Sequence, residues 1–279
     1  MVLDVSNPAS PTEISRLYLG DNSGQGKGIA LNGNYALVAA GDAGLLIIDI
    51  SIPTSPSLVA AYATQAPALD VTVAGDHAFV SEGEAGVEII DISTPSAPAL
   101  TSSFDTPGFA YSVAVSGNYA YVADGSTGLQ IFDISLPASP ALVTGLSIPG
   151  VTRAVEVSNS LAVIAADIFG LLMVDVSNPA APVLAASYDT PGTAWDVAVH
   201  SGIAFVADLN SGLQILDISN PAAPIFLSNV SGYTSDVFVL DSLVYAVDYR
   251  TGLTILNVSN VSAPTMVGQF VADTYVYDV

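Results

Sequence analysis

The sequence predicts an all-β fold, a β-propeller of four-stranded blades. Three observations support this prediction: a unit of about 42 residues recurs along the chain, apolar and polar residues alternate inside each unit, and Gly, Pro, Asn and Ser separate the alternating runs. Repeated units of four short strands are typical of propeller blades. Because no stretch shows helical periodicity, the sequence favours small antiparallel sheets over helical repeats.

The triplet Asp-(Ile/Val)-Ser marks the repeat, and a Gly lies five residues before each complete copy from Gly44 onward. We expect the Asp and Ser to accept hydrogen bonds in the turn that follows the third strand. The Gly should adopt a backbone conformation that other residues resist. The alternative is that the repeated carboxyl and amide groups bind cations. The triplets begin at Asp4, Asp49, Asp91, Asp133, Asp175, Asp217 and, as Asn-Val-Ser, Asn257.

One unit shows how four strands arise. The stretch "YSVAVSGNYAYVAD" alternates with a period of two and turns at Gly117-Asn118, a typical hairpin dipeptide. "GLQIFDIS" then forms a third strand and "PALVTGLSI" a fourth. The recurrent Val of each first strand should pack blade against blade; these residues are Val71, Val113, Val155, Val197 and Val237.

The segments "GLLIIDIS", "GLQIFDIS" and "GLLMVDVS" resemble the LVIVD repeat of bacterial and archaeal cell-surface proteins. The resemblance covers essentially the whole chain. It implies a β-propeller and an extracellular or cell-surface location, and it implies no reaction.

The register predicts a single propeller domain over residues 1–279, most simply with seven blades. Six units are complete, from about residue 27 to about residue 273, and the seventh is split between 1–26 and 274–279. About sixteen residues of the seventh unit are absent, counting from the register of the others. Either the ring closes on a defective blade, or the chain is a segment of a longer surface protein, which we favour.

Composition excludes several partners. Four Lys and Arg residues stand against 26 Asp and Glu, a net charge of −22, so nucleic acid is a poor partner and anionic membranes are disfavoured. The apolar runs are too short for membrane insertion. With no Cys, disulfides and thiolate chemistry are excluded.

Function is expected where units differ yet face the same way, in the loop entering the first strand and the loop between the second and third strands. Three of the four cations and the only Trp fall there. Aromatic rings would stack on a ligand and cations would bind a carboxylate or another anion. Alternatively, the cations neutralise neighbouring carboxylates. The candidate ligand-binding residues are Lys27, Tyr111, Arg153, Trp195, Tyr249, Arg250 and Tyr277.

Calcium is the one cofactor that the sequence suggests. Four of the acidic side chains in the loops between second and third strands could converge, and hard cations prefer several oxygen ligands. No loop shows the dense acidic spacing of a dedicated calcium loop. The candidates are Asp42, Glu84, Asp124 and Asp208.

We therefore expect a non-catalytic binding or adhesion module of a cell-surface or secreted protein, presenting its loops to a glycan, polymer or protein ligand. The alternative is a hydrolase or lyase that uses channel carboxylates, since Glu156 replaces a small residue in a first strand and burial would raise its pKa. A third hypothesis is a structural spacer in a surface layer. No nucleophile elbow or phosphate loop supports catalysis.

Overall fold

The computed structural model describes residues 1–18, 27–273 and 275–279. The described residues form six four-stranded sheets and one two-stranded sheet. Residues 19–26 and 274, which the sequence assigns to the split seventh unit, lie outside the described residues. The chain divides into two compact units, one made of Met1–Asp4 and Thr12–Gly145, the other of Val5–Pro11 and Leu146–Val279.

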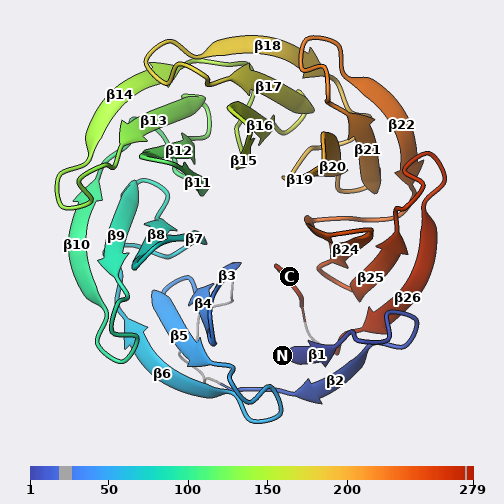
Figure 1. Ribbon diagram of the computed structural model, residues 1–279, viewed down its shortest axis with the longest axis horizontal. Helices are drawn as coiled ribbons and strands as arrows, with labels where there is room; N and C mark the ends of the chain where they lie inside the picture. The colour runs from blue at the N-terminus through green and yellow to red at the C-terminus, as the bar shows by residue number, and fades with distance from the viewer. Residues whose placement is uncertain (19–26, 274) are drawn as a thin grey trace. The chain divides into compact units, whose positions relative to one another are not determined.

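Unit 1 holds three four-stranded blades and the two-stranded sheet, and each blade pairs its strands in chain order (Figure 1). We call β3–β6 blade 1, β7–β10 blade 2 and β11–β14 blade 3. The strands are β1 (Val2–Asp4), β2 (Thr12–Ser15), β3 (Gly28–Asn32), β4 (Tyr35–Ala39), β5 (Leu45–Asp49), β6 (Ser57–Tyr62), β7 (Asp70–Ala74), β8 (His77–Ser81), β9 (Val87–Asp91), β10 (Ala99–Phe104), β11 (Ser112–Ser116), β12 (Tyr119–Ala123), β13 (Leu129–Asp133) and β14 (Ala141–Leu146).

Unit 2 repeats the same plan in three further blades. We call β15–β18 blade 4, β19–β22 blade 5 and β23–β26 blade 6. The strands are β15 (Ala154–Ser158), β16 (Leu161–Ala165), β17 (Leu171–Asp175), β18 (Val183–Tyr188), β19 (Asp196–His200), β20 (Ile203–Ala207), β21 (Leu213–Asp217), β22 (Ile225–Val230), β23 (Asp236–Leu240), β24 (Leu243–Asp248), β25 (Gly252–Asn257) and β26 (Thr265–Val271).

The repeated triplet caps the turn after each third strand, as the sequence predicts. In blade 4 the Ser177 N–H donates to Asp175 Oδ1 at 2.9 Å, and the same bond recurs in all six blades at 2.8–2.9 Å. The hydrogen bonds with this Ser lower the pKa of the Asp175 carboxyl. The triplet therefore ends the strand by giving a turn N–H a side-chain acceptor.

The Gly at the start of each third strand, just before it in blades 1 to 5 and its first residue in blade 6, has a positive φ in all six blades, between 72° and 116°. A Cβ atom at Gly170 would collide with the carbonyl oxygen of Tyr188, and one at Gly212 would collide with that of Val230. The expected conformational role of this Gly is confirmed.

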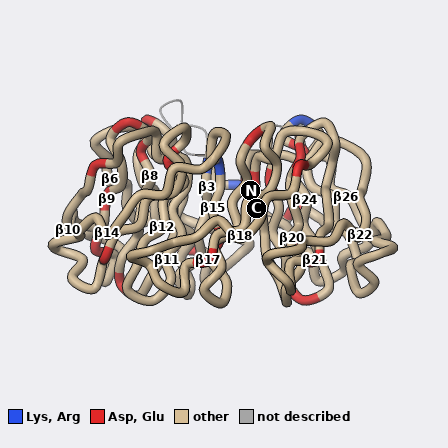
Figure 2. Tube along the Cα trace, turned by 90° about the horizontal axis from the view of Figure 1, so that it is seen from above, with Lys and Arg blue, Asp and Glu red and all other residues tan. Residues whose placement is uncertain are grey.

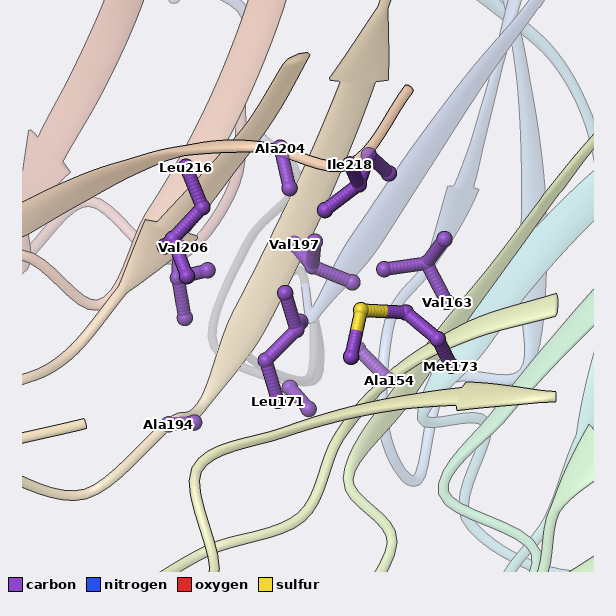
Figure 3. Packing of buried hydrophobic residues seen from close by; sticks show 11 residues of the cluster. Ala154, Val163, Leu171, Met173, Ala194, Val197, Ala204, Val206, Leu216 and Ile218 are labelled. Atoms are coloured by element: carbon purple, nitrogen blue, oxygen red, sulfur yellow. The ribbon is translucent and has the colours of Figure 1, made fainter. Parts of the chain in front are cut away.

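The hydrophobic core lies between successive blades of each unit. The first strands of neighbouring blades lie side by side (Figure 1), and apolar side chains of both blades interlock behind them. Figure 3 shows one such cluster in unit 2, in which Leu171 and Met173 of blade 4 pack with Val197 and Val206 of blade 5. The five predicted core valines of the first strands are 3% to 7% exposed, so this prediction is confirmed.

Two pairs of consecutive blades are also joined at their outer strands. Ser102 Oγ of β10 donates to the carbonyl oxygen of Pro137 in the turn of blade 3, and Ser228 Oγ of β22 donates to that of Val261 in blade 6, both at 2.5 Å. Ser15 of β2 makes the same bond to Pro53 of blade 1. The two-stranded sheet therefore meets blade 1 as a preceding blade would, in agreement with β1 and β2 being third and fourth strands.

The blade number is settled in part. Six blades are complete, from Gly28 to Val271, and the two-stranded sheet adds half a blade. A seventh blade and a single domain over the whole chain stay predictions. Within the described ranges, no helix is long and apolar enough to cross a membrane.

Candidate functional site

The variable positions are brought together by the backbone. In blades 1, 2, 4 and 5 the turn between the second and third strands pairs with the segment that enters the next blade's first strand. In unit 2 the Asp167 N–H donates to Ala194 O at 3.1 Å, and the Ala194 N–H returns a bond to Asp167 O at 2.9 Å. Leu209 pairs in the same way with Thr234. We call these turns and entry segments the loop face of each unit.

Many charged residues lie at the strand ends and in the connecting loops (Figure 2). On the loop face of unit 2, Arg153 Nη2 lies 3.0 Å from Asp167 Oδ2, and the Arg153 Cζ atom lies 4.5 Å from the centroid of the Trp195 ring. Trp195 is 40% exposed, and the adjoining turn exposes Ile168 and Phe169. We call Arg153, Asp167 and Trp195 the tryptophan cluster. It joins two predicted ligand residues and also contains the predicted pairing of a cation with a carboxylate.

A second aromatic group, which we call the tyrosine cluster, forms around blade 6. Arg250 Nε donates to the Tyr249 hydroxyl at 2.6 Å, and its guanidinium lies 4.9 Å from the Tyr249 ring centroid. Tyr249 contacts Tyr233 at 5.2 Å and Tyr275 at 6.0 Å between centroids, and Tyr275 lies 6.4 Å from Tyr277.

The sequence identified three residues of the tyrosine cluster and missed two. Tyr249, Arg250 and Tyr277 were predicted, and the structure groups them. Tyr233 and Tyr275 were not predicted. A usable signal existed, because each lies two residues before an entry position that was already seen to vary.

Unit 1 places its two candidates differently. The Tyr111 ring packs 4.5 Å from that of Phe109, and Phe109 covers Gly83 in the turn of blade 2. Lys27 is exposed, and its N–H donates to Ala39 O at 2.7 Å as the chain enters blade 1. Phe109, which the sequence reasoning missed, makes this aromatic pair a cover for the neighbouring turn.

The four calcium candidates fall into two kinds. Asp42 and Glu84 are exposed, whereas Asp124 and Asp208 are fully buried. No three acidic or histidine side chains of the described ranges are grouped to hold a metal ion. Calcium at these four residues stays a prediction.

The two buried carboxyls fasten the entry segment of their own blade. Asp208 accepts a hydrogen bond from the Thr190 hydroxyl at 2.7 Å and another from the Gly192 N–H at 2.8 Å. Asp124 accepts one from the Gly108 N–H at 2.9 Å. Burial raises the pKa of both carboxyls. These contacts explain why an acidic residue recurs at this turn position.

Blade 2 contains a buried carboxyl pair that the sequence did not reveal. Glu82 and Glu88 are 3% and 5% exposed and their carboxyls interact, and the Ala66 N–H donates to Glu82 Oε2 at 2.9 Å. Burial, together with the neighbouring Glu88, raises the pKa of Glu82 to about 7. The missed signal was internal: blades 3 and 5 carry Gln130 and Gln214 where blade 2 has Glu88.

Carboxylates of the first strands reach across to the next blade. Glu156 Oε2 accepts a hydrogen bond from the Val199 N–H at 2.6 Å, and Asp196 Oδ2 accepts one from the Val237 N–H at 2.9 Å. Burial is the main cause that raises the pKa of Glu156 to about 7. Glu156 thus connects the first strands of blades 4 and 5.

Comparison with protein-family models identifies the family of the chain. The description "LVIVD repeat" matches residues 1–18, 23–64, 67–106, 107–146, 149–190, 191–231 and 231–272. The chain belongs to the LVIVD repeat family. The resemblance seen in the sequence is confirmed, and the matched LVIVD repeats follow the blades and the two-stranded sheet.

No curated protein matches this LVIVD chain. Among solved structures it is similar to that described as the crystal structure of the computationally designed Ika8 protein, with a TM-score of 0.67 and 12% identity. The match covers 86% of this chain and 73% of the designed one. At this identity the likeness concerns the fold alone.

Proposed function

We propose that the chain is a non-catalytic binding module whose unit 2 loop face holds a neutral carbohydrate. The observation that carries the proposal is the exposure of Trp195, 40% of whose surface is open although Arg153 covers part of the ring. An indole ring with a polar neighbour offers the apolar face and the hydrogen-bonding edge that a sugar ring needs. A cell-surface or extracellular location belongs to the same proposal and is supported by the resemblance to surface-protein repeats.

The charges favour a neutral ligand over an anion. Arg153 is held by Asp167 at 3.0 Å, so its charge is largely compensated. The net charge of −22 repels anionic ligands as they approach. A neutral sugar avoids both costs, because stacking on an aromatic ring needs no net charge.

The tyrosine cluster supports a ligand longer than one sugar. Tyr275 is 63% exposed and Arg250 is exposed beside it. Two aromatic groups on the same unit suit an oligosaccharide or polymer that contacts both. A protein partner is the other ligand class that exposed aromatic and Arg side chains favour.

The test uses Trp195 as its own reporter, because the chain has no other Trp. We expect neutral oligosaccharides to shift Trp195 emission in a saturable way, with acidic oligosaccharides binding less. Calorimetric titration of Trp195→Ala should show affinity weakened by about tenfold or more, roughly 1.4 kcal/mol.

Leu69→Ala is the matched control, since Leu69 occupies the same entry position in blade 2, and it should bind like the parent. Equal weakening by both variants would contradict the assignment to unit 2. A panel of neutral sugars that leaves emission and heat unchanged would reject the carbohydrate proposal.

A hydrolase or lyase is the second candidate, because Glu156 has a pKa raised to about 7, a value suited to a general acid. Its bond to the Val199 N–H supports a linking role instead. Turnover of any glycan that binds, abolished in Glu156→Gln with binding retained, would favour this candidate over the binding module.

A further inference from the structure

A hollow of about 370 Å³ lies at the junction of blades 4 and 5, at the strand ends opposite the loop face. It is lined by the hairpin between β15 and β16, by the turn that follows β17 and by the corresponding turn of blade 5. Ligand pockets occupy roughly 300–1,000 Å³, so this hollow has room for a small molecule or for one side chain of a partner.

The hollow lies where a link between blades is missing. Ser102 and Ser228 each link their blade to the turn of the next blade through the side-chain hydroxyl. The equivalent residue of blade 4 is Ala186, which has no hydroxyl to donate, and the equivalent turn residue, Pro221, lines the hollow. The hollow is therefore tied to a junction whose outer strand lacks the hydrogen-bond donor.

The lining of the hollow includes an ionised carboxyl. Asp175 is exposed, whereas the equivalent residue is half-buried in the other five blades. Its Oδ1 atom accepts a hydrogen bond from the Ser177 N–H at 2.9 Å. The hydrogen bonds with this Ser lower the pKa of the carboxyl, so it is charged at neutral pH. Among the described residues that line the hollow there is no Lys or Arg to neutralise this charge.

The hairpin of blade 4 adds polar groups to the lining together with backbone strain. Asn159 and Ser160 both line the hollow, and both have a positive φ, 49° and 64°. Residues with side chains rarely adopt this conformation, and the corresponding hairpins of blades 1, 2, 3 and 5 contain a Gly. A Gly would relieve the strain but would bring neither a hydroxyl nor an amide. Strain that is kept at a polar hollow points to a use for these groups.

We propose that the hollow binds a primary ammonium group on a short alkyl chain, as in a free amine or a Lys side chain. An ammonium donates three hydrogen bonds and accepts none, which matches a carboxylate with hydroxyl and amide oxygens around it. The alkyl chain would lie against Leu161, Ala185 and Pro221, which belong to the apolar part of the lining. The net charge of −22 attracts such a cation as it approaches.

The test is a titration of the protein with n-butylamine, with n-butanol as the neutral analogue, followed by NMR at the Ser177 N–H. This N–H donates to Asp175 and therefore reports on the carboxyl. We expect the amine to shift its resonance in a saturable way and the alcohol to bind at least about tenfold more weakly, because it lacks the charge. Equal binding of amine and alcohol, or no shift with any amine, would overturn the proposal.

Two further amines distinguish the sources of the ammonium group. Tighter binding of Nα-acetyl-lysine methylamide than of 1,4-diaminobutane would support a Lys side chain of a protein partner. The reverse order would support a free amine. The site lies away from the loop face, so its test does not depend on the carbohydrate proposal.

The decisive variant is Asp175→Asn. It should keep the turn, because Asn257 accepts the Ser259 N–H at 2.9 Å at the same place in blade 6. We expect it to weaken amine binding by about tenfold or more, since a charged partner is lost. Asp133→Asn is the matched control: it removes the same charge at the equivalent turn of blade 3 and should bind the amine as the parent does. Equal losses in both variants would show general attraction to an acidic surface and would overturn the site.

Discussion

Blades 4 and 5 lie next to each other in unit 2 and fasten the same loop by opposite means. In blade 5 the turn carboxyl of Asp208 holds the Thr190 hydroxyl and the Gly192 N–H. In blade 4 the equivalent turn residue is Ala166, and the equivalent of Thr190 is Ile148, which is 6% exposed. The same two positions are therefore both polar in blade 5 and both apolar in blade 4.

The exchange moves the acidic residue by one position. Blade 4 carries its turn carboxylate at Asp167, where it pairs with Arg153 on the loop face, instead of burying it at the position of Asp208. Blade 4, which lacks the buried polar pair, is thus the blade that has a charged pair beside Trp195. The comparison teaches that a buried structural carboxylate and a partly exposed carboxylate of the loop face occupy adjacent residues of equivalent turns.

The first strands show the same freedom. Blade 4 supplies an acceptor to the next blade from Glu156, the third residue of its first strand, whereas blade 5 does so from Asp196, the first residue. In both cases the carboxyl accepts a hydrogen bond from a backbone N–H of the next first strand. That strand lies at the edge of its sheet, so this N–H has no partner within the sheet. The requirement is conserved between the blades while the residue that meets it moves.

The largest expected effect tests what blades 4 and 5 share. Gly170→Ala and Gly212→Ala should each destabilise the protein by more than about 3 kcal/mol, because a left-handed backbone and a collision with a carbonyl oxygen act together. Urea unfolding followed by circular dichroism measures both. A cost below about 1 kcal/mol in either blade would contradict the tight approach of the two strands.

Asp208→Ala should cost about 3 kcal/mol, since it leaves the Thr190 hydroxyl and the Gly192 N–H buried without an acceptor. The double variant Asp208→Ala with Thr190→Ile copies blade 4 and should recover about half of the loss. Asp167→Ala in blade 4 is the control, with an expected loss under about 1 kcal/mol. Failure of the double variant to recover any stability would show that the two fastenings are not interchangeable.

The carboxyl of Glu156 makes blade 4 sensitive to pH, whereas blade 5 has Ala198 at that position. Because folding raises its pKa from 4.5 to about 7, its stabilisation is present in full below about pH 4.5 and is lost as the pH rises through 7. The loss is at most about 3 kcal/mol and nearer 2 kcal/mol after solvent screening. Glu156→Gln should flatten the dependence of the unfolding midpoint on pH between 4.5 and 8, and an unchanged profile would rule out Glu156 as its source.

The smallest effect concerns the tryptophan cluster. Arg153→Ala should lower the free energy of unfolding by about 1 kcal/mol, since it removes a partly exposed ion pair and a cation–π contact. The emission of Trp195 should change at the same time, because the guanidinium lies 4.5 Å from its ring. Arg16→Ala, which removes the partly exposed pair with Glu13, is the control and should leave the emission unaltered.

Sequence periodicity was enough to predict the blades, the turn caps and the special Gly residues, because these depend on local backbone requirements that recur at the same register. The depth of each acidic side chain was not predictable in the same way. Asp167 and Asp208 occupy neighbouring positions of equivalent turns, yet one reaches the loop face and the other is buried. The packing of one blade against the next determines which carboxyl is buried, and this packing cannot be predicted from one sequence alone.

The sequence was enough to predict many of the residues of the candidate site, but not which of them lie together in the tryptophan and tyrosine clusters. Arg153 and Trp195 stood out because the chain has four cations and one Trp. Tyr233 escaped notice because the chain has twelve Tyr residues, and Glu88 did so because it lies inside a strand. Alignment of each residue with its counterparts in the other units would have marked both.

The hydrogen bond between an outer-strand Ser and the turn of the following blade, made by Ser102 to Pro137 and by Ser228 to Val261, has a consequence for the gene. Because two junctions of different blades use the same contact, a duplication or deletion of one whole 42-residue unit rebuilds a junction of a kind that the protein already contains. Recombination between repeats can therefore change the number of blades without inventing a new interface, and the inherited unit is the blade together with its junction.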